Sequence, residues 1–291
     1  MSEMSLFSKA ELPRPSLTIE DAADILSSVY GLKGELRELG SQQDRNFKVG
    51  IARESYVLKI SRSEYPRVEL EAQNAILQHL ASKQDDGFDS SFVIPKVISC
   101  RNGEFIGAAT VGAENYHVRL LSFIEGETLT ARKYLNGTAI EALGTLAGNV
   151  AYALADFSHP GAVKKSPWDL AYSEAAIPFL LQDSDSSSVA APILVAMEQV
   201  RKRLDPVKAE LRVQVIHHDI TDDNVVGRRE ISGSVLPYAV IDFGDMTKGW
   251  LIAELATTCA SLLHHGNRDP FSILPAIKAF HAVCPLEKEE L

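Results

Sequence analysis

The chain has 291 residues, of which 45% are hydrophobic and 23% are charged, a composition typical of a packed globular protein and not of a disordered one. Its formal net charge of −10 argues against a surface that binds nucleic acid. No stretch comes near the roughly 20 uninterrupted apolar residues of a membrane span. The first residues also lack the basic and apolar regions of a secretory signal.

The cysteines Cys100, Cys259 and Cys284 are spread singly along the chain. They form no C-x-x-C pair that would suggest zinc, and isolated cysteines in odd number are typical of reduced, buried thiols. We therefore expect a cytoplasmic protein. Its acidic balance favours small cationic substrates, although most acidic proteins have no such substrate.

The first part of the chain is predicted to alternate between strands and helices. Residues 1–17 are expected to form an extended lead-in, and Thr18 followed by two acids predicts a helix that Gly31 ends. Residues 35–60 show the period of strands in three short runs, and residues 67–80 show an apolar side typical of a helix. Further strands are expected at residues 93–99, 105–110 and 117–124.

The second part of the chain is predicted to be mainly helical. Residues 125–128 end the sheet region, so we expect an N-terminal lobe at 18–124 and a C-terminal lobe at 125–291. Helices are expected at residues 138–157, 189–204, 250–264 and 270–283. The fold class is therefore α+β, with a small β-rich lobe followed by a larger, mainly helical one.

A polar motif with fixed spacing lies between two strand-like runs. Residues 215–226 read V-I-H-H-D-I-T-D-D-N-V-V, and a later run, V-I-D-F-G, carries Asp242. The order H-x-D-x-x-x-x-N and then D-F-G is typical of kinase-type phosphoryl transfer. That reaction needs a carboxylate to orient and deprotonate the acceptor hydroxyl, and oxygen ligands for Mg²⁺. Asp219 is predicted to be the catalytic base, and Asn224 and Asp242 the metal ligands.

Neighbouring polar residues leave alternatives open. Alone, the first motif could be an ordinary polar turn, but the two motifs in this order favour catalysis. His217 is expected to bond the backbone of the loop, and His218 lies either near the phosphates or beneath them. Asp245 is either a further metal ligand or a solvated loop acid.

Lys59 lies inside the apolar run at residues 55–60. A lysine that reaches from a strand end to water is the ordinary explanation, but a kinase needs a cation on the α- and β-phosphates, held by a helix carboxylate. Helix 67–80 offers Glu69 and Glu71, which lie two residues apart and therefore on different faces. Only one of them can point at Lys59.

The tip of the first hairpin stands where a protein kinase has its phosphate-binding loop. Residues 40–46 read G-S-Q-Q-D-R-N and contain no G-x-G-x-x-G. The backbone at Gly40 and Ser41 could still approach phosphates, and an ordinary hairpin turn is the alternative. Ser41 and Asn46 are the candidate nucleotide-binding residues of this segment.

These residues resemble the aminoglycoside phosphotransferase and choline kinase-like superfamily, whose members carry H-G-D-x-x-x-x-N and D-F-x-D/E. The positions that match are His217, Asp219, Asn224, Asp242 and Asp245, while His218 replaces the usual Gly. The resemblance is closest to the hydroxylysine kinase-like branch, which includes kinase domains fused to class-III aminotransferases. It covers most of the chain from residue 22 to 290, with supporting stretches at 44–47, 56–60, 71–77, 159–160 and 168–169.

The resemblance implies a protein kinase-like fold that uses ATP and Mg²⁺ to phosphorylate a small hydroxyl acceptor, often one with an amine. It selects Glu71 as the ion-pair partner of Lys59, and it implies an adenine site at the hinge, residues 120–125, with Ser122 and Ile124 as candidates. The expected acceptor is an amino alcohol or a hydroxy-amino acid such as hydroxylysine. The alternatives are an aminoglycoside or antibiotic kinase, or a nucleotide-binding regulatory module without turnover.

Two departures from the superfamily stand out. Glu254 occupies a position where many members have Asp, and we expect a structural role for it. Residues 285–291 look like the start of another helix, whereas relatives continue further. We therefore expect either a domain of a longer protein, with a possible fusion partner downstream, or an unusually short gene product.

Overall fold

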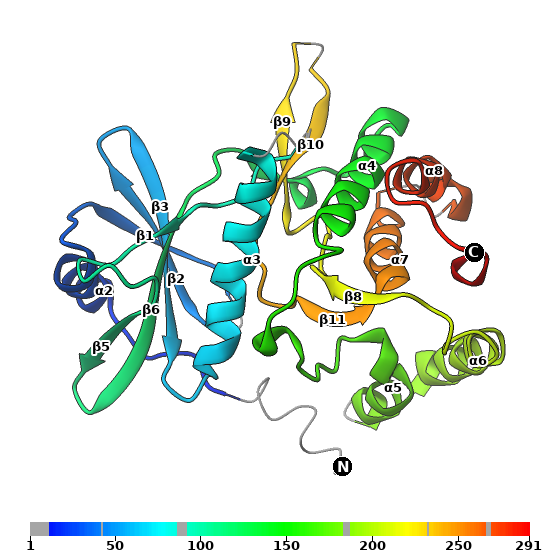
Figure 1. Cartoon of the computed structure of the whole chain (residues 1–291), viewed down its shortest axis with the longest axis horizontal. Coiled ribbons are helices and arrows are strands. Elements are labelled where there is room, and N and C mark those ends of the chain that lie inside the picture. The colour runs from blue at the N-terminus through cyan, green and yellow to red at the C-terminus, as the bar shows by residue number, and fades with distance from the viewer. Residues whose placement is uncertain (1–11, 42, 86–91, 183–186, 232, 266–268) are drawn as a thin grey trace.

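The chain folds into two lobes that meet along helix α3 (Arg67–Asp85), as Figure 1 shows. The computed structural model describes residues 12–41, 43–85, 92–182, 187–231, 233–265 and 269–291, so most of the predicted lead-in lies outside the described residues. A β-rich lobe stands on one side of α3 and a larger, mainly helical lobe on the other. The two-lobed α+β fold expected from the sequence is confirmed.

An antiparallel sheet forms the N-terminal lobe, with strand order β1-β2-β3-β6-β4 and with β5 also paired to β6. The strands are β1 (Glu35–Leu39), β2 (Arg45–Ile51), β3 (Glu54–Arg62), β4 (Val97–Ile98), β5 (Gly107–Val111) and β6 (Glu114–Ser122). Leu39, Asn46, Lys59 and Arg119 are successive partners across β1, β2, β3 and β6. Because residues directly opposite each other share a face, these four side chains form one row on one face of the sheet.

The opposite face of the sheet is apolar, because side chains alternate along each strand. Phe47, Leu58 and Ile60, which lie next to the row residues in sequence, are fully buried. They belong to the same cluster as apolar residues of helix α2 (Ile19–Ile25). One face of the sheet therefore packs on α2. The row of four side chains lies on the other face, towards α3 and the second lobe.

Helix α2 begins and ends where the sequence predicts. Thr18 accepts a hydrogen bond from the backbone of Asp21 and completes a capping box, which satisfies N–H groups that a helix start leaves unpaired. The helix continues into a π-helical turn, η1 (Leu26–Tyr30), and ends at Gly31 with φ +69°. Glycine adopts this left-handed conformation without steric cost.

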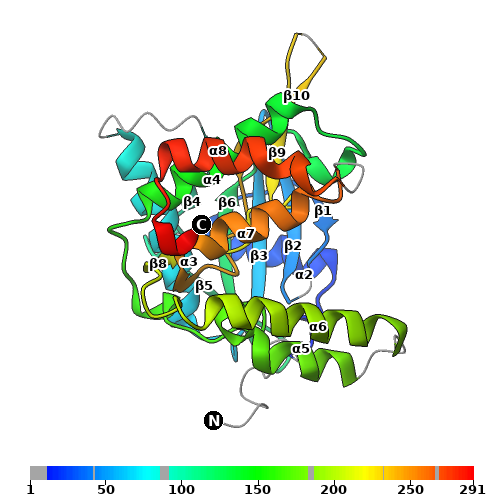
Figure 2. The same ribbon diagram turned by 90° about the vertical axis from the view of Figure 1, so that its right-hand side faces the viewer.

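Helices dominate the C-terminal lobe (Figures 1 and 2). They are α4 (Gly137–Ala153), α5 (Ser173–Gln182), α6 (Ser187–Leu204), α7 (Leu251–Leu262) and α8 (Leu274–Val283). Short strands form two small sheets, β7 (Glu127–Thr128) with β9 (Val225–Arg229) and β10 (Val235–Val240), and β8 (Val213–Ile216) with β11 (Thr247–Trp250). Single 3₁₀ turns are η2 (Leu129–Ala131), η3 (Pro160–Ala162), η4 (Leu170–Tyr172), η5 (Pro270–Ile273) and η6 (Lys288–Glu290). Helix α5, which carries Pro178, was not among the predicted elements.

One predicted strand is shorter because its start belongs to the other lobe. The backbone of Val93 donates to Tyr238 and accepts from Val240, at 2.8 and 3.0 Å. This bridge draws residue 93 onto β10 of the C-terminal lobe. Of the strand predicted at residues 93–99, only β4 remains in the N-terminal sheet.

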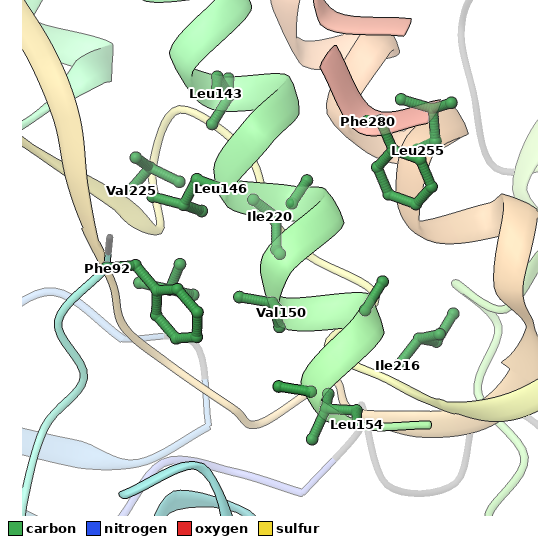
Figure 3. Packing of buried hydrophobic residues seen from close by; sticks show 14 of the residues in the cluster. Phe92, Leu143, Leu146, Val150, Leu154, Ile216, Ile220, Val225, Leu255 and Phe280 are labelled. Carbon is green, nitrogen blue, oxygen red and sulfur yellow. The ribbon is translucent and has the colours of Figure 1, made fainter. Parts of the chain in front are cut away.

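Helix α4 is the centre of the larger hydrophobic core. Figure 3 shows its residues Leu143, Leu146 and Val150, with Leu154 at its C-cap, between Phe92 and Val225 on one side and Ile216, Leu255 and Phe280 on the other. At Gly144 the helix comes so close to α8 that an added Cβ would lie 2.1 Å from the carbonyl oxygen of Ala276. A glycine is therefore required for α4 and α8 to pack at this distance.

Gly144→Ala is expected to lower the free energy of unfolding by about 1–3 kcal/mol or more, because the backbone of α8 must move to admit the methyl group. Urea denaturation followed by circular dichroism measures this change. Gly137→Ala, in the first turn of the same helix, has no atom within 4 Å of the added Cβ and serves as the control. Equal stabilities of the two variants would contradict the close packing of α4 on α8.

The last residues fold back onto the C-terminal lobe. The helix start predicted at residues 285–291 is limited to the 3₁₀ turn η6. Glu290 in this turn is buried and forms an ion pair with Arg212, which precedes β8. Among the described residues, no helix has the length and apolar character needed to cross a membrane.

Candidate active site

The polar motif forms a loop between β8 and β9. Within it the His217 ring accepts a hydrogen bond from the Asp219 N–H at Nδ1, at 3.2 Å, and its Nε2 lies 3.1 Å from the carbonyl oxygen of Ile241. Burial lowers the pKa of His217 to about 4, so the ring is neutral and Nε2 carries the proton that it donates to Ile241. The structural role predicted for His217 is confirmed.

His218 lies beneath the loop and does not line the cavity described below. Its side chain is 4% exposed, and its ring nitrogens have no hydrogen-bond partner among the described residues. Its backbone has φ +69°, the left-handed conformation that glycine adopts most readily. Of the two positions left open for His218, the buried one is correct.

Glu254 supports the loop from α7. Its Oε2 accepts hydrogen bonds from the backbone N–H groups of His217 and His218, at 2.7 and 3.2 Å. The side chain is fully buried, and burial raises the pKa of Glu254 to about 7. The predicted structural role of Glu254 is confirmed, since this carboxylate holds the backbone next to Asp219.

The raised pKa of Glu254 predicts a pH-dependent stability. Between pH 4.5 and about 7 the folded state keeps a proton that the unfolded state has released. The contribution of this group to the free energy of unfolding is therefore complete below pH 4.5 and is lost as the pH rises to about 7. Glu254→Gln is expected to remove this dependence, which amounts to about 3 kcal/mol for a shift of this size. Urea unfolding of both proteins at pH 5 to 8 measures it. Parallel pH profiles would contradict the prediction.

Asp219 and Asn224 form a hydrogen-bonded pair. The Asn224 Nδ2 donates to the Asp219 Oδ2 at 2.5 Å and to the Asp219 carbonyl oxygen at 3.1 Å. Both donors are on the amide nitrogen, so the Asn224 Oδ1 is left for another ligand. Burial and the nearby carboxylate of Asp245 raise the pKa of Asp219 to about 7, within the range suited to a general base at neutral pH.

Lys59 and Asp242 join the two lobes. The Lys59 Nζ lies 3.2 Å from the Asp242 Oδ1, and the Gly244 N–H donates to the same oxygen at 3.2 Å. The positive charge of Lys59 lowers the pKa of Asp242, so this carboxylate is ionised. Asp242 has φ +56°, a conformation that is uncommon for a residue other than glycine.

The prediction that Glu71 pairs with Lys59 is wrong. Glu71 is exposed and forms an ion pair with Arg67 on its own helix at 3.0 Å. Glu69 instead points into the protein, is 5% exposed, and lies 3.9 Å from the Lys164 Nζ. Residues two apart on a helix lie about 200° from each other, and α3 is rotated so that Glu69 and not Glu71 faces the cleft.

Lys164 is a residue of the site that the sequence reasoning missed. Its Nζ donates to the carbonyl oxygen of Gly244 at 2.5 Å, directly after Asp242 and Phe243. Asp245 is largely buried, which raises its pKa, and the charge of Lys164 opposes that rise. Lys164 belongs to an irregular segment between η3 and η4, where no periodic pattern marks a functional residue.

Two adjoining cavities lie between the lobes. The first, of about 550 Å³, is lined in part by Ser41, Lys59, Glu69, Lys164, Asp219, Asn224, Asp242 and Asp245. The second, of about 450 Å³, is lined in part by Asn46, Val57, Leu77, Leu121, Ser122, Ile124 and Phe243. Lys59, Asn224 and Asp242 line both, so the cavities meet at these residues.

The candidate nucleotide-binding residues differ in what they can offer. Ser41 uses its hydroxyl oxygen to accept from the Asp44 N–H, at 3.2 Å. Ser122 donates its N–H to Lys96 and accepts from the Lys96 N–H with its hydroxyl, so its N–H is not free for a base, while the O–H of its side chain can still donate. Ile124 lies two residues further on, beyond the end of β6. Asn46 is buried in β2 with its Oδ1 unpaired among the described residues.

The donor set fits a magnesium ion held together with phosphates. The described residues contain no group of three His, Cys, Asp or Glu side chains able to hold a metal by themselves. Mg²⁺ uses one or two carboxylates plus water and substrate phosphates, so no closed cage is needed. Asp242, Asn224 and Asp245 line the same cavity. Burial and, to a lesser extent, the charge of a neighbouring carboxylate raise the pKa of Asp219 and of Asp245, and a bound cation would relieve the repulsion between these charges.

The fold and this site together define a phosphotransferase of the kinase type. The model of the phosphotransferase enzyme family matches residues 35–283, and the chain belongs to this family. The enzyme class predicted from the sequence, a small-molecule kinase, is thereby confirmed.

Relatives and solved structures agree with the family. The chain is 24% identical to hydroxylysine kinase of Mus musculus, over 95% of this chain and 77% of the relative, and 26% identical to that of Xenopus laevis, over 95% and 78%. Among solved structures, a microcompartment-associated aminopropanol kinase has a TM-score of 0.72 at 19% identity, covering 94% of this chain and 83% of the other. An amicoumacin kinase in complex with AMP-PNP and Ca²⁺ has a TM-score of 0.67 at 14% identity, with 93% and 79% covered. These structures confirm the fold.

Proposed function

We propose that the protein is an ATP- and Mg²⁺-dependent kinase that phosphorylates a hydroxyl group of a small molecule with an amine, either an amino alcohol or a hydroxy-amino acid such as hydroxylysine. One observation carries the proposal: Lys59 of the N-terminal lobe meets Asp242 of the C-terminal lobe at 3.2 Å, in a cavity that also holds Asp219 bonded to Asn224. Kinase chemistry requires these four groups together.

The nucleotide would occupy the second cavity and extend into the first. Val57 and Leu121 supply an apolar surface for the base, next to the hinge at Ile124. The phosphates would then lie at Lys59, where the two cavities meet. On this proposal the lobe boundary falls between residues 124 and 125, and the base is held between the lobes.

The acceptor would occupy the first cavity, with its hydroxyl at Asp219. The Asp219 carboxylate, whose Oδ2 accepts from Asn224, would orient the hydroxyl and take its proton. Bound Mg²⁺, held by Asp242 and the Asn224 Oδ1, would supply neutralisation of charge on the phosphates. Lys59 would hold the α- and β-phosphates, so that the γ-phosphoryl group faces the attacking oxygen and ADP leaves on the opposite side.

The charge of the first cavity favours a cationic acceptor. Its lining includes six carboxylates, Asp44, Glu69, Asp219, Asp223, Asp242 and Asp245, against the three lysines Lys59, Lys164 and Lys165. Trp168, whose side chain is half exposed, stands at the same cavity and offers an aromatic face to an ammonium group. The relatives named hydroxylysine kinase and aminopropanol kinase support an amine-bearing acceptor. A cytoplasmic location, where ATP and reduced thiols occur, is part of this proposal.

ADP release with Mg·ATP and a panel of acceptors tests this function. Hydroxylysine, 1-amino-2-propanol, ethanolamine, choline and homoserine represent the proposed class, and an aminoglycoside represents the alternative. Lysine, which lacks the hydroxyl group, is the matched control for hydroxylysine. We expect acceptor-dependent ADP release that needs both Mg²⁺ and the hydroxyl. Preference for an aminoglycoside would favour an antibiotic kinase. Binding of Mg·ATP without transfer to any acceptor would favour a regulatory module and contradict the proposal.

A further inference from the structure

A polar row of the N-terminal sheet faces the second cavity. Its members Asn46, Lys59 and Arg119 are direct neighbours on β2, β3 and β6, and all three line this cavity. Val57 and Leu121, which are also partners and lie two residues further along β3 and β6, line it as well. The sheet therefore lines the cavity with an apolar pair of residues and, next to it, with a row of polar residues that includes two cations.

Arg119 is a buried cation without a carboxylate partner. Its side chain is 2% exposed, and it takes part in no ion pair among the residues that the structure describes. Burial lowers the pKa of the guanidinium, and the charges of Asp44 and Asp242 oppose this effect from beyond ion-pair distance. The group donates instead to two neutral amides of α3, to the Gln73 Oε1 at 2.6 Å and to the Asn74 Oδ1 at 3.5 Å. A buried charge is costly unless an opposite charge compensates it. The position therefore favours an anion nearby.

The hydrogen bond to Arg119 fixes the orientation of the Gln73 amide. A guanidinium has only donors, so it must face the oxygen of Gln73, and the amide nitrogen is turned away from it. Gln73 is the residue of α3 that lines both cavities, together with Lys59 and Asp242. The Gln73 Nε2 has no hydrogen-bond partner among the residues that the structure describes.

We propose that Gln73, held in orientation by Arg119, binds a phosphate oxygen of the nucleotide through its Nε2 and makes the affinity of the site depend on the number of phosphates. Gln73 is then a binding residue and Arg119 a positioning residue that also adds positive charge. This proposal rests on the proposed function, because it requires that a nucleoside polyphosphate occupies the cleft. It assigns to α3 a neutral donor on the phosphates, where the sequence led us to expect a carboxylate paired with Lys59.

Gln73→Glu tests the proposal, because a glutamate at this position can form an ion pair with Arg119 and so retain the packing of α3 on the sheet. It would, however, replace the donor by a carboxylate that repels phosphate. Calorimetry with adenosine, AMP, ADP and ATP in the presence of Mg²⁺ gives the affinity for each ligand. We expect the affinity for ATP and ADP to fall about tenfold to 100-fold, the affinity for adenosine to be unchanged, and the melting temperature to be equal or higher.

Two control variants separate the contact from general effects of charge. Gln78→Glu makes the same change at an exposed position of the same helix. Asn74→Asp places a carboxylate on the same guanidinium, but Asn74 does not line either cavity. Both controls are expected to keep the gain in affinity from adenosine to ATP that the unchanged protein shows.

The possible outcomes are distinct. Loss of the gain from adenosine to ATP in Gln73→Glu alone supports the proposal. An equal loss for adenosine and ATP would show a purely structural role for Gln73 and overturn it, as would an unchanged affinity for ATP. If the unchanged protein itself binds neither ATP nor ADP, the proposed function fails, and this inference fails with it for a reason that the first measurement identifies.

Discussion

Asp219→Asn is expected to lower kcat for phosphoryl transfer by about 10²–10⁴-fold, the contribution typical of a general base. An asparagine can still meet the Asn224 Nδ2 with its amide oxygen, so the loop should keep its hydrogen bond, but it cannot take a proton from the acceptor. The affinity for Mg·ATP should change little, because the role that we propose for Asp219 is on the acceptor. Initial rates of ADP release and calorimetry with ATP measure the two quantities separately.

Glu71→Gln is the matched control, since it also neutralises a carboxylate. Glu71 is exposed and paired with Arg67, so this variant is expected to keep kcat and KM. The same variant tests whether Glu71 is unpaired with Lys59, as the structure shows. A large loss of activity would restore Glu71 as the partner of Lys59. Full activity of Asp219→Asn would refute the assignment of the base.

Asp242→Asn is expected to lower kcat by at least about 100-fold, as the loss of one strong electrostatic contact to the reacting group does in other enzymes. The carboxylate is ionised because Lys59 lowers its pKa, and it is the only residue that pairs with Lys59 among those that the structure describes. Its replacement removes the proposed charged metal ligand and leaves a buried lysine without its anion. We also expect the concentration of Mg²⁺ needed for half-maximal rate to rise.

Asp245→Asn distinguishes the two carboxylates that follow β10. Asp245 lines the first cavity, and burial raises its pKa, whereas the charge of Lys59 lowers the pKa of Asp242, so the negative charge of Asp242 is the better stabilised of the two. We expect a smaller loss of kcat and a smaller shift in Mg²⁺ dependence than in Asp242→Asn. The reverse order in a titration of rate against Mg²⁺ would assign the principal metal ligand to Asp245.

Elements set by local patterns could be predicted from the sequence. The start of α2 at Thr18 and its end at Gly31 follow from capping and from a left-handed glycine, which involve only neighbouring residues. The loop from His217 to Asn224 was predicted for the same reason, because its hydrogen bonds join residues two to five positions apart. Interactions between residues so close in the chain can be inferred directly from the order of the residues.

The partners of α3 could not be predicted in this way. An apolar stripe predicts a helix, but α3 is buried on two sides, against the N-terminal sheet and against η3, where a Cβ on Gly161 would lie 2.0 Å from the Val68 carbonyl oxygen. Both Leu70 and Ile76 are buried, on different sides of the helix. The spacing of apolar residues shows which face of a helix is buried only when the helix has a single apolar stripe. The rotation of α3 about its axis therefore could not be derived from its sequence pattern.

The sequence by itself determined the two-lobed plan and the phosphotransfer motif with Asp219, Asn224 and Asp242, because periodicity and fixed spacing encode them locally, and the family resemblance added Lys59 as a candidate. The tertiary structure alone decided which groups meet. It paired Lys59 with Asp242 instead of Glu71, brought Lys164 to Gly244 and placed Gln73 on Arg119. These contacts join residues 46 to 183 positions apart, and they depend on the rotation of α3 and on the approach of the lobes, which no local pattern specifies.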